Sequence, residues 1–427
     1  MDFNGLSIDQ APPISAPLRF FLSAPLFGII AGILLLVSDP LALLSRYSLE
    51  SIAITHAITI GFFGFIMLGA MTQMLPVLAG VKIKNVQSVT KYVHILLVLG
   101  LLALILAFIT QVSFLFVLAM ITLGLGFIVL ISLIGLSIKD VKNFTPTVKN
   151  MAISLFFAFV SVVLGLVLVS DYWLDSMSEF HIVLSNIHSV WAIFGFAGIL
   201  LIGVAFQVLP MFYVAPQFKN FCVSKVAKII SFGLVLWLVL NLFFDSYAYV
   251  AKIWIALFFW AFATTTWIKL NQRKRKVSDI TIWYWRFASV FLTLGSFFWI
   301  FDEYYQSQYT VLAGILLGLG FLMSIMIGML YKIVPFLVWF HLNGAGYMSI
   351  PTMNEMINKK LAKLQFALFY TSLLGFIVAF FFPSVLWFFA LTFILSMAIL
   401  EYNVVTCALL YAKIKKTKPD FDMSAFQ

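Results

Sequence analysis

The chain has 427 residues, of which 63% are hydrophobic and only 10% are charged, and its formal net charge is +10. Soluble domains use roughly half apolar residues, so this composition excludes a soluble protein and predicts an integral membrane protein. The polar segments are too short to build a core of their own. We therefore expect residues 1–427 to form a single membrane domain.

Apolar segments follow one another along the whole chain. A helix that crosses a bilayer needs about 20 apolar residues, and twelve segments meet this requirement. The expected spans lie near residues 18–37, 51–79, 92–110, 113–137, 149–170, 180–214, 224–244, 248–268, 281–301, 310–340, 362–382 and 384–412. The predicted fold class is an all-α polytopic membrane protein with about twelve transmembrane helices.

The second, sixth and tenth of these spans share a glycine motif that ends in proline. Two copies have glycine seven, twelve and fifteen residues before Pro76 and Pro210, and glutamine three residues before. The copy that ends at Pro335 keeps two of these glycines. Because the prolines recur at intervals of about a third of the chain, we predict an internal repeat. The three four-helix pseudo-repeats would cover residues 17–140, 148–270 and 280–412.

Small residues let helix backbones approach closely in lipid, so we expect the three long helices to pack against one another. Each proline would kink or end its helix and free a carbonyl one turn earlier. We expect the side chains three residues before the prolines to help satisfy these carbonyls. They are Gln73, Gln207 and Lys332. Lys332 is also a candidate functional group, since an ammonium within a span is costly, although it could instead snorkel toward the membrane surface.

Basic residues gather after the even-numbered spans, whereas only Arg46 and Lys252 follow odd-numbered spans. The positive-inside rule then places both termini in the cytoplasm. We expect a multi-pass protein of a bacterial inner membrane, with the lipid bilayer as its partner. Attraction to anionic lipid accounts for the surplus of positive charge, so no nucleic-acid partner is predicted.

Two of the five histidines, His56 and His188, are expected within spans and near the same face of the membrane. Neutral imidazole is a common axial ligand of haem iron, so both are candidate cofactor-binding and metal-binding residues. They lie twenty and twenty-two residues before their motif prolines, which separates them by about 200° around a helix. They could share a cofactor only if the two helices are rotated relative to each other. The alternative for each is a hydrogen-bonded histidine of the helix core.

Two further groups of polar residues are candidates for chemistry. His181 lies seven residues before His188 and near several acidic residues, so this segment could admit a metal ion or simply form a wet acidic loop. Glu401 lies in the middle of the twelfth span, where a carboxylate often belongs to a proton or ion path. Its partner would be Lys332 or a glutamine, and the alternative is a hydrogen-bonded packing residue.

This arrangement resembles subunit I of the haem-copper oxidase superfamily. The segment Thr55–Gly64 (THAITIGFFG), followed by Gln73–Pro76 (QMLP), resembles the second helix of distant bacterial members. The segment Asn186–Trp191 (NIHSVW) resembles their sixth helix. The resemblance implies that His56 binds a haem b.

The chain departs from that family where the copper centre is expected. Residues 223–245 and 302–322 contain no histidine, and Ala192 stands where a tyrosine would follow the sixth-helix histidine. The resemblance therefore implies a haem without a copper centre. The second ligand would be His188 or a methionine such as Met177, or that position would stay open.

The role that this resemblance implies is electron transfer, gas sensing or support of a respiratory complex, with a respiratory or cytochrome partner, and not oxygen reduction. No residue is assigned a catalytic role. The alternative from another class is a haem-free transporter or structural membrane protein on the same scaffold, with Glu401 and Lys332 along its path.

Overall fold

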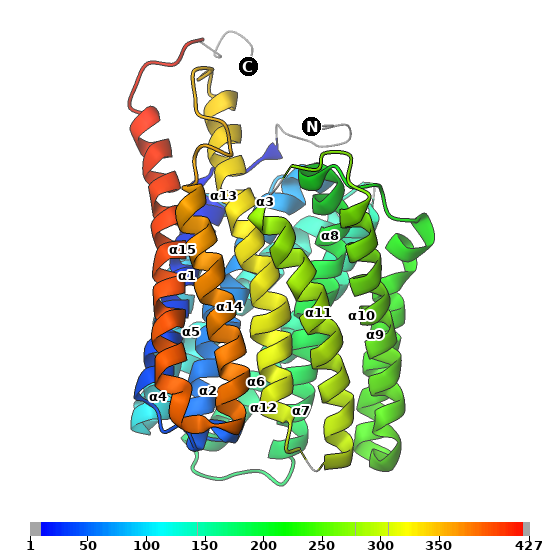
Figure 1. Cartoon of the computed structure of the whole chain (residues 1–427). Coiled ribbons are helices and arrows are strands. Elements are labelled where there is room, and N and C mark those ends of the chain that lie inside the picture. Colours follow the sequence, from blue (N-terminus) through cyan, green and yellow to red (C-terminus); the bar gives the residue numbers. More distant parts are fainter. Residues whose placement is uncertain (1–9, 143, 278, 306, 422–427) are drawn as a thin grey trace.

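The computed structural model describes residues 10–421 apart from residues 143, 278 and 306 (Figure 1). Within this part of the chain, twelve helices are long and apolar enough to cross a membrane. This confirms the prediction of an all-α polytopic membrane protein.

Nine of the spans are uninterrupted helices. They are α1 (Ser15–Val37), α4 (Val86–Thr110), α5 (Ser113–Lys139), α6 (Pro146–Trp173), α9 (Asn220–Phe243), α10 (Ala248–Asn271), α11 (Ile280–Phe301), α14 (Lys359–Phe381) and α15 (Leu386–Ile414). Short 3₁₀ turns lie between some of them. These turns are η2 (Ala42–Leu44), η5 (Asp245–Tyr247), η6 (Asp302–Tyr305) and η8 (Pro383–Val385).

The three spans that carry the glycine motif are longer, and a π-helical segment interrupts each of them. The second span is α2 (Leu49–His56), η3 (Ala57–Gly64) and α3 (Phe65–Ala79). The sixth is α7 (His181–Val190), η4 (Trp191–Gly198) and α8 (Ile199–Tyr213). The tenth is α12 (Thr310–Gly314), η7 (Ile315–Met323) and α13 (Ser324–Gly344).

The three π-helical segments are in register with the motif. They end at Gly64, Gly198 and Met323, each twelve residues before its proline. Such segments are rare and are found frequently at functional sites. The threefold repeat itself stays a prediction, and the structure adds a backbone feature that recurs at its predicted period.

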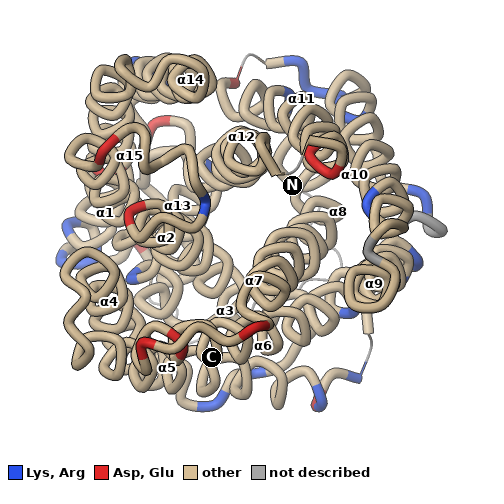
Figure 2. The backbone as a smooth tube through the Cα atoms, turned by 90° about the horizontal axis from the view of Figure 1, so that it is seen from below, with Lys and Arg blue, Asp and Glu red and all other residues tan. Residues whose placement is uncertain are grey.

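The three long spans form the centre of the molecule, and the other nine helices surround them (Figure 2). The most apolar windows of the long spans are 72%, 72% and 78% buried, whereas those of the other spans are between 28% and 50% buried. The outer helices form a closed ring in which each contacts the next, in the order α1, α4, α5, α6, α9, α10, α11, α14, α15 and back to α1. The outer helices therefore face lipid and the inner spans face the core.

The motif glycines seven and fifteen residues before the prolines pack against the helix that precedes each long span, and not against the other long spans as expected. A Cβ added fifteen residues before the prolines, at Gly61, Gly195 or Gly320, would lie 2.4, 2.6 or 2.7 Å from a phenylalanine ring. These rings belong to Phe27 of α1, Phe157 of α6 and Phe291 of α11. The glycines bring the first and second helix of each predicted repeat into close contact.

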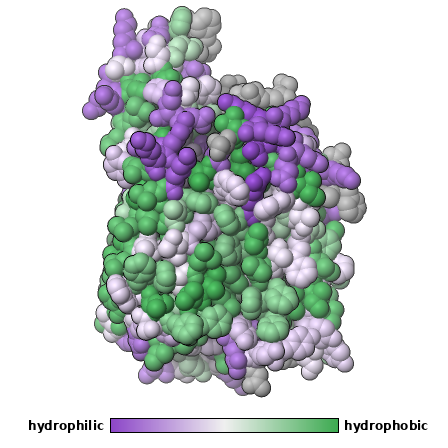
Figure 3. All heavy atoms as spheres, in the orientation of Figure 1, coloured by the Kyte–Doolittle hydropathy of each residue, from purple (hydrophilic) through white to green (hydrophobic). Residues whose placement is uncertain are grey.

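A hydrophobic band surrounds the middle of the molecule, and hydrophilic side chains gather above and below it (Figure 3). We call the end at which α1 begins and α15 ends the basic end, because Lys82, Lys274 and Lys413 lie there with most other lysines. The opposite end, with Asp39, Asp171 and Glu303, is the acidic end. This pattern is the one expected for a chain that spans a bilayer many times.

Candidate cofactor site

A cavity of about 690 Å³ lies among the three long spans toward the acidic end. Its walls include residues of all three π-helical segments. Ligand and cofactor sites typically occupy about 300–1,000 Å³, so the cavity is large enough for a cofactor. The segments of the repeated motif that depart from α-helical geometry are thus the ones that surround this space.

His56 and His188 meet in this cavity. Their ring centroids are 6.2 Å apart, and the ring planes differ by 25°. Nδ1 of His56 lies 2.8 Å from the carbonyl oxygen of Ile52, and Nδ1 of His188 lies 2.8 Å from that of Ser161. A carbonyl only accepts hydrogen bonds, so each Nδ1 carries the proton and Nε2 has a free lone pair. This is the arrangement of metal-ligating histidines.

Two residues on neighbouring outer helices position the imidazole rings. The Phe108 ring of α4 lies nearly parallel to the His56 ring, at 22°, with centroids 6.3 Å apart. Gly165 of α6 leaves space for the other ring, because a Cβ there would lie 3.1 Å from Cε1 of His188. Both histidines are only half-buried because they line the cavity.

His56 and His188 lie at different distances from their motif prolines, yet both side chains line the same cavity. The second and sixth spans are therefore rotated relative to each other, as a shared cofactor requires. The structure also agrees in part with the alternative of a hydrogen-bonded histidine in the helix core, because each ring is hydrogen-bonded to a backbone carbonyl. Those bonds use only one nitrogen of each ring. In the described part of the chain, no hydrogen bond reaches Nε2 of either histidine.

Part of the cavity wall that the tenth span forms consists of glycines. Gly314 and Gly318 both line it, and a Cβ built on either glycine meets no atom within 4 Å. The spacing of four residues places both on one face of the helix. The tenth span, whose only histidine, His341, lies in the last turn of α13 and does not line the cavity, therefore supplies open volume beside the two imidazoles.

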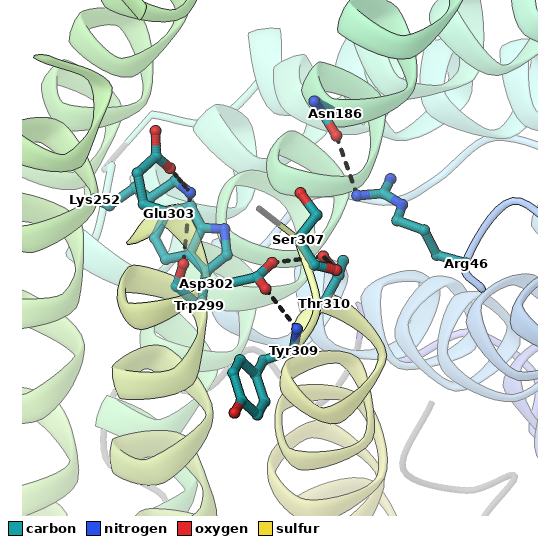
Figure 4. Close-up of polar contacts among 9 residues, drawn as sticks. All are labelled: Arg46, Asn186, Lys252, Trp299, Asp302, Glu303, Ser307, Tyr309 and Thr310. Atoms are coloured by element: carbon teal, nitrogen blue, oxygen red, sulfur yellow. Dashed lines mark hydrogen bonds and ion pairs between the residues drawn. The ribbon is translucent and has the colours of Figure 1, made fainter. Parts of the chain in front are cut away.

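Polar groups line the cavity at its acidic end (Figure 4). Arg46 donates to Asn186 Oδ1 at 3.1 Å and to Ser189 Oγ at 3.2 Å, both neutral acceptors. No carboxylate lies within ion-pair distance of Arg46 in the part of the chain that the structure describes. This guanidinium is available to an anionic group.

The other charged groups of this region already have partners (Figure 4). Lys252 forms an ion pair with Glu303 and lies over the Trp299 ring, 5.3 Å from its centroid. The buried carboxylate of Asp302 accepts from the Tyr309 amide at 2.6 Å and from the Thr310 hydroxyl at 2.5 Å. Arg46 thus differs from Lys252 in having only neutral acceptors.

The other predicted ligands lie elsewhere or have partners. His181 lines the cavity, but its Nδ1 lies 2.7 Å from Asp171 Oδ2. Among the described residues, no group of three His, Cys, Asp or Glu side chains could hold a metal ion, so of the two alternatives for the segment around His181 the structure favours an acidic loop over a metal site. Met177 is 55% exposed and does not line the cavity, so the structure does not bring it together with His56.

The polar groups expected to act together within the spans are separate. Lys332 forms an ion pair with Asp279, which caps the N-terminus of α11, and lies 5.8 Å from the centroid of the Tyr213 ring. The expected pairing of Lys332 with Glu401 is therefore wrong. A buried oxygen of Glu401 has no hydrogen-bond partner among the described residues, and neither Glu401 nor Lys332 lines the cavity.

The glutamines do not satisfy the carbonyls that the prolines free. A carbonyl needs a hydrogen-bond donor, and no described hydrogen bond is donated by the side-chain amide of Gln73 or Gln207. Oε1 of Gln73 is also buried without a described partner. Pro76 and Pro210 are followed by the end of their helices within three residues, whereas α13 continues to Gly344 beyond Pro335. The proline motif is thus a helix end in two copies only.

Several residues of the site carry no recognisable signal in the sequence. Phe108 is one of 47 phenylalanines, and Gly165, Gly314 and Gly318 lie outside the repeated motif. Arg46 stands out only as a basic residue after an odd-numbered span. Their roles depend on which helices meet, and hydropathy does not encode this.

No protein-family model matches the chain, and no curated protein matches it.

Proposed function

We propose that this multi-pass protein binds a haem b in the cavity, where His56 and His188 would hold its iron. The observation that carries the proposal is the meeting of two imidazoles from different spans in one cavity, each with Nδ1 bound to a carbonyl. The ring centroids lie 6.2 Å apart, so both imidazoles lie close enough to bind one metal ion, since metal–imidazole nitrogen distances are about 2 Å.

The residues around the histidines suit such a cofactor. Gly314 and Gly318 leave space on one wall, and Phe108 offers an aromatic ring beside His56. Arg46 is suited to bind a carboxylate because its described acceptors are neutral. Lys252 is less suited, since Glu303 already neutralises it.

The proposed role is electron transfer, gas sensing or support of a respiratory complex, and not oxygen reduction. A haem held by these two histidines would supply one-electron chemistry or, with one histidine released, a site for a diatomic gas. The residues of this chain hold the rings in one tautomer, exclude water with apolar walls and place one cation at the rim. We further propose a relationship to haem-copper oxidase subunit I, which rests on the segments around His56 and His188.

The proposed location is a bacterial inner membrane, with the basic end in the cytoplasm. The distribution of lysine and arginine supports this orientation. The haem cavity would then lie toward the outer face, where a respiratory or cytochrome partner could exchange electrons with it.

The test is the visible spectrum of the full chain, purified in detergent after expression with ample haem, in the oxidised and dithionite-reduced states. We expect a Soret band and reduced haem bands in the wild type and their loss in His56→Ala. In His188→Ala we expect either loss of haem or a five-coordinate haem that binds carbon monoxide. A colourless wild type, or an unchanged spectrum in His56→Ala, would refute the proposal.

Two matched variants separate haem binding from folding. His94→Ala removes a histidine that pairs with Ser23 near the basic end, and we expect it to keep the wild-type spectrum. Gly318→Phe fills the cavity from a position where a Cβ meets no neighbour. We expect a folded protein without haem bands, as judged by gel filtration together with the spectrum.

A further inference from the structure

A second, smaller cavity of about 70 Å³ lies among the same three long spans, farther toward the basic end. Along the second span, the large cavity ends at Phe63 and the small one begins at Ile66. Along the tenth span the corresponding residues are Leu322 and Ile325. The two cavities are therefore stacked along the central spans, about one helical turn apart.

Methionine dominates the wall of the small cavity. Six of the 16 methionines of the chain line it, and they come from three different helices. They are Met67, Met71 and Met74 of α3, Met151 of α6, and Met326 and Met329 of α13. Five of these six side chains are buried, and Met74 is half-buried. Single methionines commonly fill gaps in apolar cores, but here six methionines of three helices line one small cavity.

Thioether sulfur is a soft, neutral ligand that selects Cu(I) among the biological metal ions. Hard cations such as Mg²⁺ require oxygen ligands, and the residues that line this cavity offer none in their side chains. The ring of Trp285 also lines the cavity, and an indole face attracts a cation. A monovalent ion is favoured there because the cost of burying charge must be offset by coordination alone.

We propose that the methionine-lined cavity binds one Cu(I) ion through thioethers contributed by α3, α6 and α13. This site is separate from the histidine pair and does not depend on haem. It also differs from a histidine copper centre, because its ligands are sulfur atoms of three helices. The volume of about 70 Å³ suits a single ion and is far too small for a macrocycle.

The test is a titration of the detergent-purified full chain with Cu(I) under reducing conditions, in competition with a chelator of known affinity, and with Ag(I) as a redox-inert probe. The variants are Met71→Leu/Met326→Leu and, singly, Met151→Leu, because leucine keeps the volume and costs little packing energy. We expect one ion per wild-type chain and affinity at least about tenfold lower in the double variant. X-ray absorption at the copper edge should show a shell of sulfur scatterers.

The control is Met397→Leu, which changes a fully buried methionine that packs on Gly28 outside this cavity, and we expect its affinity to match the wild type. His56→Ala should lose haem and still bind Cu(I), so failure of one proposal is distinguishable from failure of the other. Wild-type binding below one ion per chain would overturn the copper proposal. Unchanged Cu(I) affinity in a folded Met71→Leu/Met326→Leu variant would also overturn it. The same holds if X-ray absorption shows nitrogen scatterers around copper that disappear in His56→Ala/His188→Ala. If the double variant does not fold, unchanged affinity in Met151→Leu has the same meaning.

Discussion

The chemistry of the site depends on how single residues constrain two imidazole rings. A histidine with Nδ1 bound to a carbonyl has one tautomer and one orientation, and both His56 and His188 are held in this way. The contacts differ, because Ile52 lies one turn before His56 on the same helix whereas Ser161 belongs to another helix. The position of the His188 ring thus depends more on packing between helices than the position of the His56 ring does.

Gly165 provides a prediction about this packing. In Gly165→Leu, the Cβ would lie 3.1 Å from Cε1 of His188, and the branched side chain would displace the ring. We expect haem affinity to fall by about 10–100-fold, the usual effect of disturbing a residue that supports a ligand, with an altered spectrum of the bound haem. Gly135→Leu is the control, because a Cβ at Gly135 meets no atom within 4 Å. Equal haem affinity in both variants would contradict this assignment.

Asp279 and Lys332 predict a pH dependence of stability. Burial alone would raise the pKa of the Asp279 carboxyl, but Lys332 and hydrogen bonds from Thr281 together hold this pKa below its usual value. The unfolded carboxyl titrates near pH 3.9, so the stabilisation is present above about pH 4 and is lost as the pH falls through the lower, folded pKa. We expect Asp279→Asn to be less stable than the wild type at pH 7 and to lose less stability on acidification.

The measurement is thermal unfolding of the detergent-solubilised protein between neutral pH and about pH 3. Asp140→Asn, which changes an exposed carboxylate at the end of α5, is the control and should follow the wild type. If the unfolding temperatures of Asp279→Asn and the wild type differ by the same amount at every pH, the pH dependence of stability does not come from titration of the Asp279 carboxyl.

At the scale of the elements, the repeated motif has two structural consequences. Its glycines bring each long span against the helix before it, and its upstream part adopts π-helical geometry beside the large cavity. The second glycine contact repeats the first one two turns later, since a Cβ at Gly69, Gly203 or Gly328 would lie 2.9, 2.5 or 2.9 Å from a side chain of the same partner helix. Close helix pairs of this kind are held by van der Waals contact in lipid.

Gly61 tests this helix pairing. In Gly61→Ala the added Cβ would lie 2.4 Å from the ring of Phe27, which is buried and has little room to move. We expect a loss of about 1–3 kcal/mol in unfolding free energy, the usual cost of overpacking. Gly135→Ala places the same methyl group in open space and should be neutral or slightly stabilising. Denaturation of both variants in detergent micelles gives the comparison, and equal stabilities would contradict the packing role.

At the scale of the molecule, a closed ring of nine helices surrounds three inner spans, so the histidines and methionines that line the two cavities are shielded from lipid. Both cavities lie among the inner spans, and the charged residues that distinguish the two ends lie outside the hydrophobic band. The two cavities thus lie in the core, and the charged residues that set the orientation in the membrane lie in the loops.

The orientation of the whole molecule is testable with single cysteines. In a variant with Cys222 and Cys407 replaced, a cysteine is introduced at Lys274 of the basic end or at Asp175 of the acidic end. We expect a membrane-impermeant maleimide to label intact cells at position 175 and to label position 274 only after the cells are opened. The reverse pattern would invert the proposed topology and place the large cavity toward the cytoplasmic side.

Much of the fold is predictable because hydropathy is a local property. The expected spans agree with the observed helices to within a few residues at most ends, although α4 begins at Val86, six residues before the expected start. The motif also identified the three spans that are most buried. Predictions that required knowledge of partners were less successful, as Lys332 pairs with Asp279 and the glutamines do not cap the carbonyls freed by the prolines.

The sequence by itself determined the number of spans, the charge asymmetry of the two ends and the position of His56 within a long glycine-rich helix. These properties follow from composition and spacing along a single chain segment. Only the tertiary structure decided that His56 and His188 lie 6.2 Å apart, that Gly165 makes room for one ring and that six methionines surround one cavity. The physical reason is that helix rotation and packing depend on contacts between segments far apart in the chain, and hydropathy carries no information about these contacts.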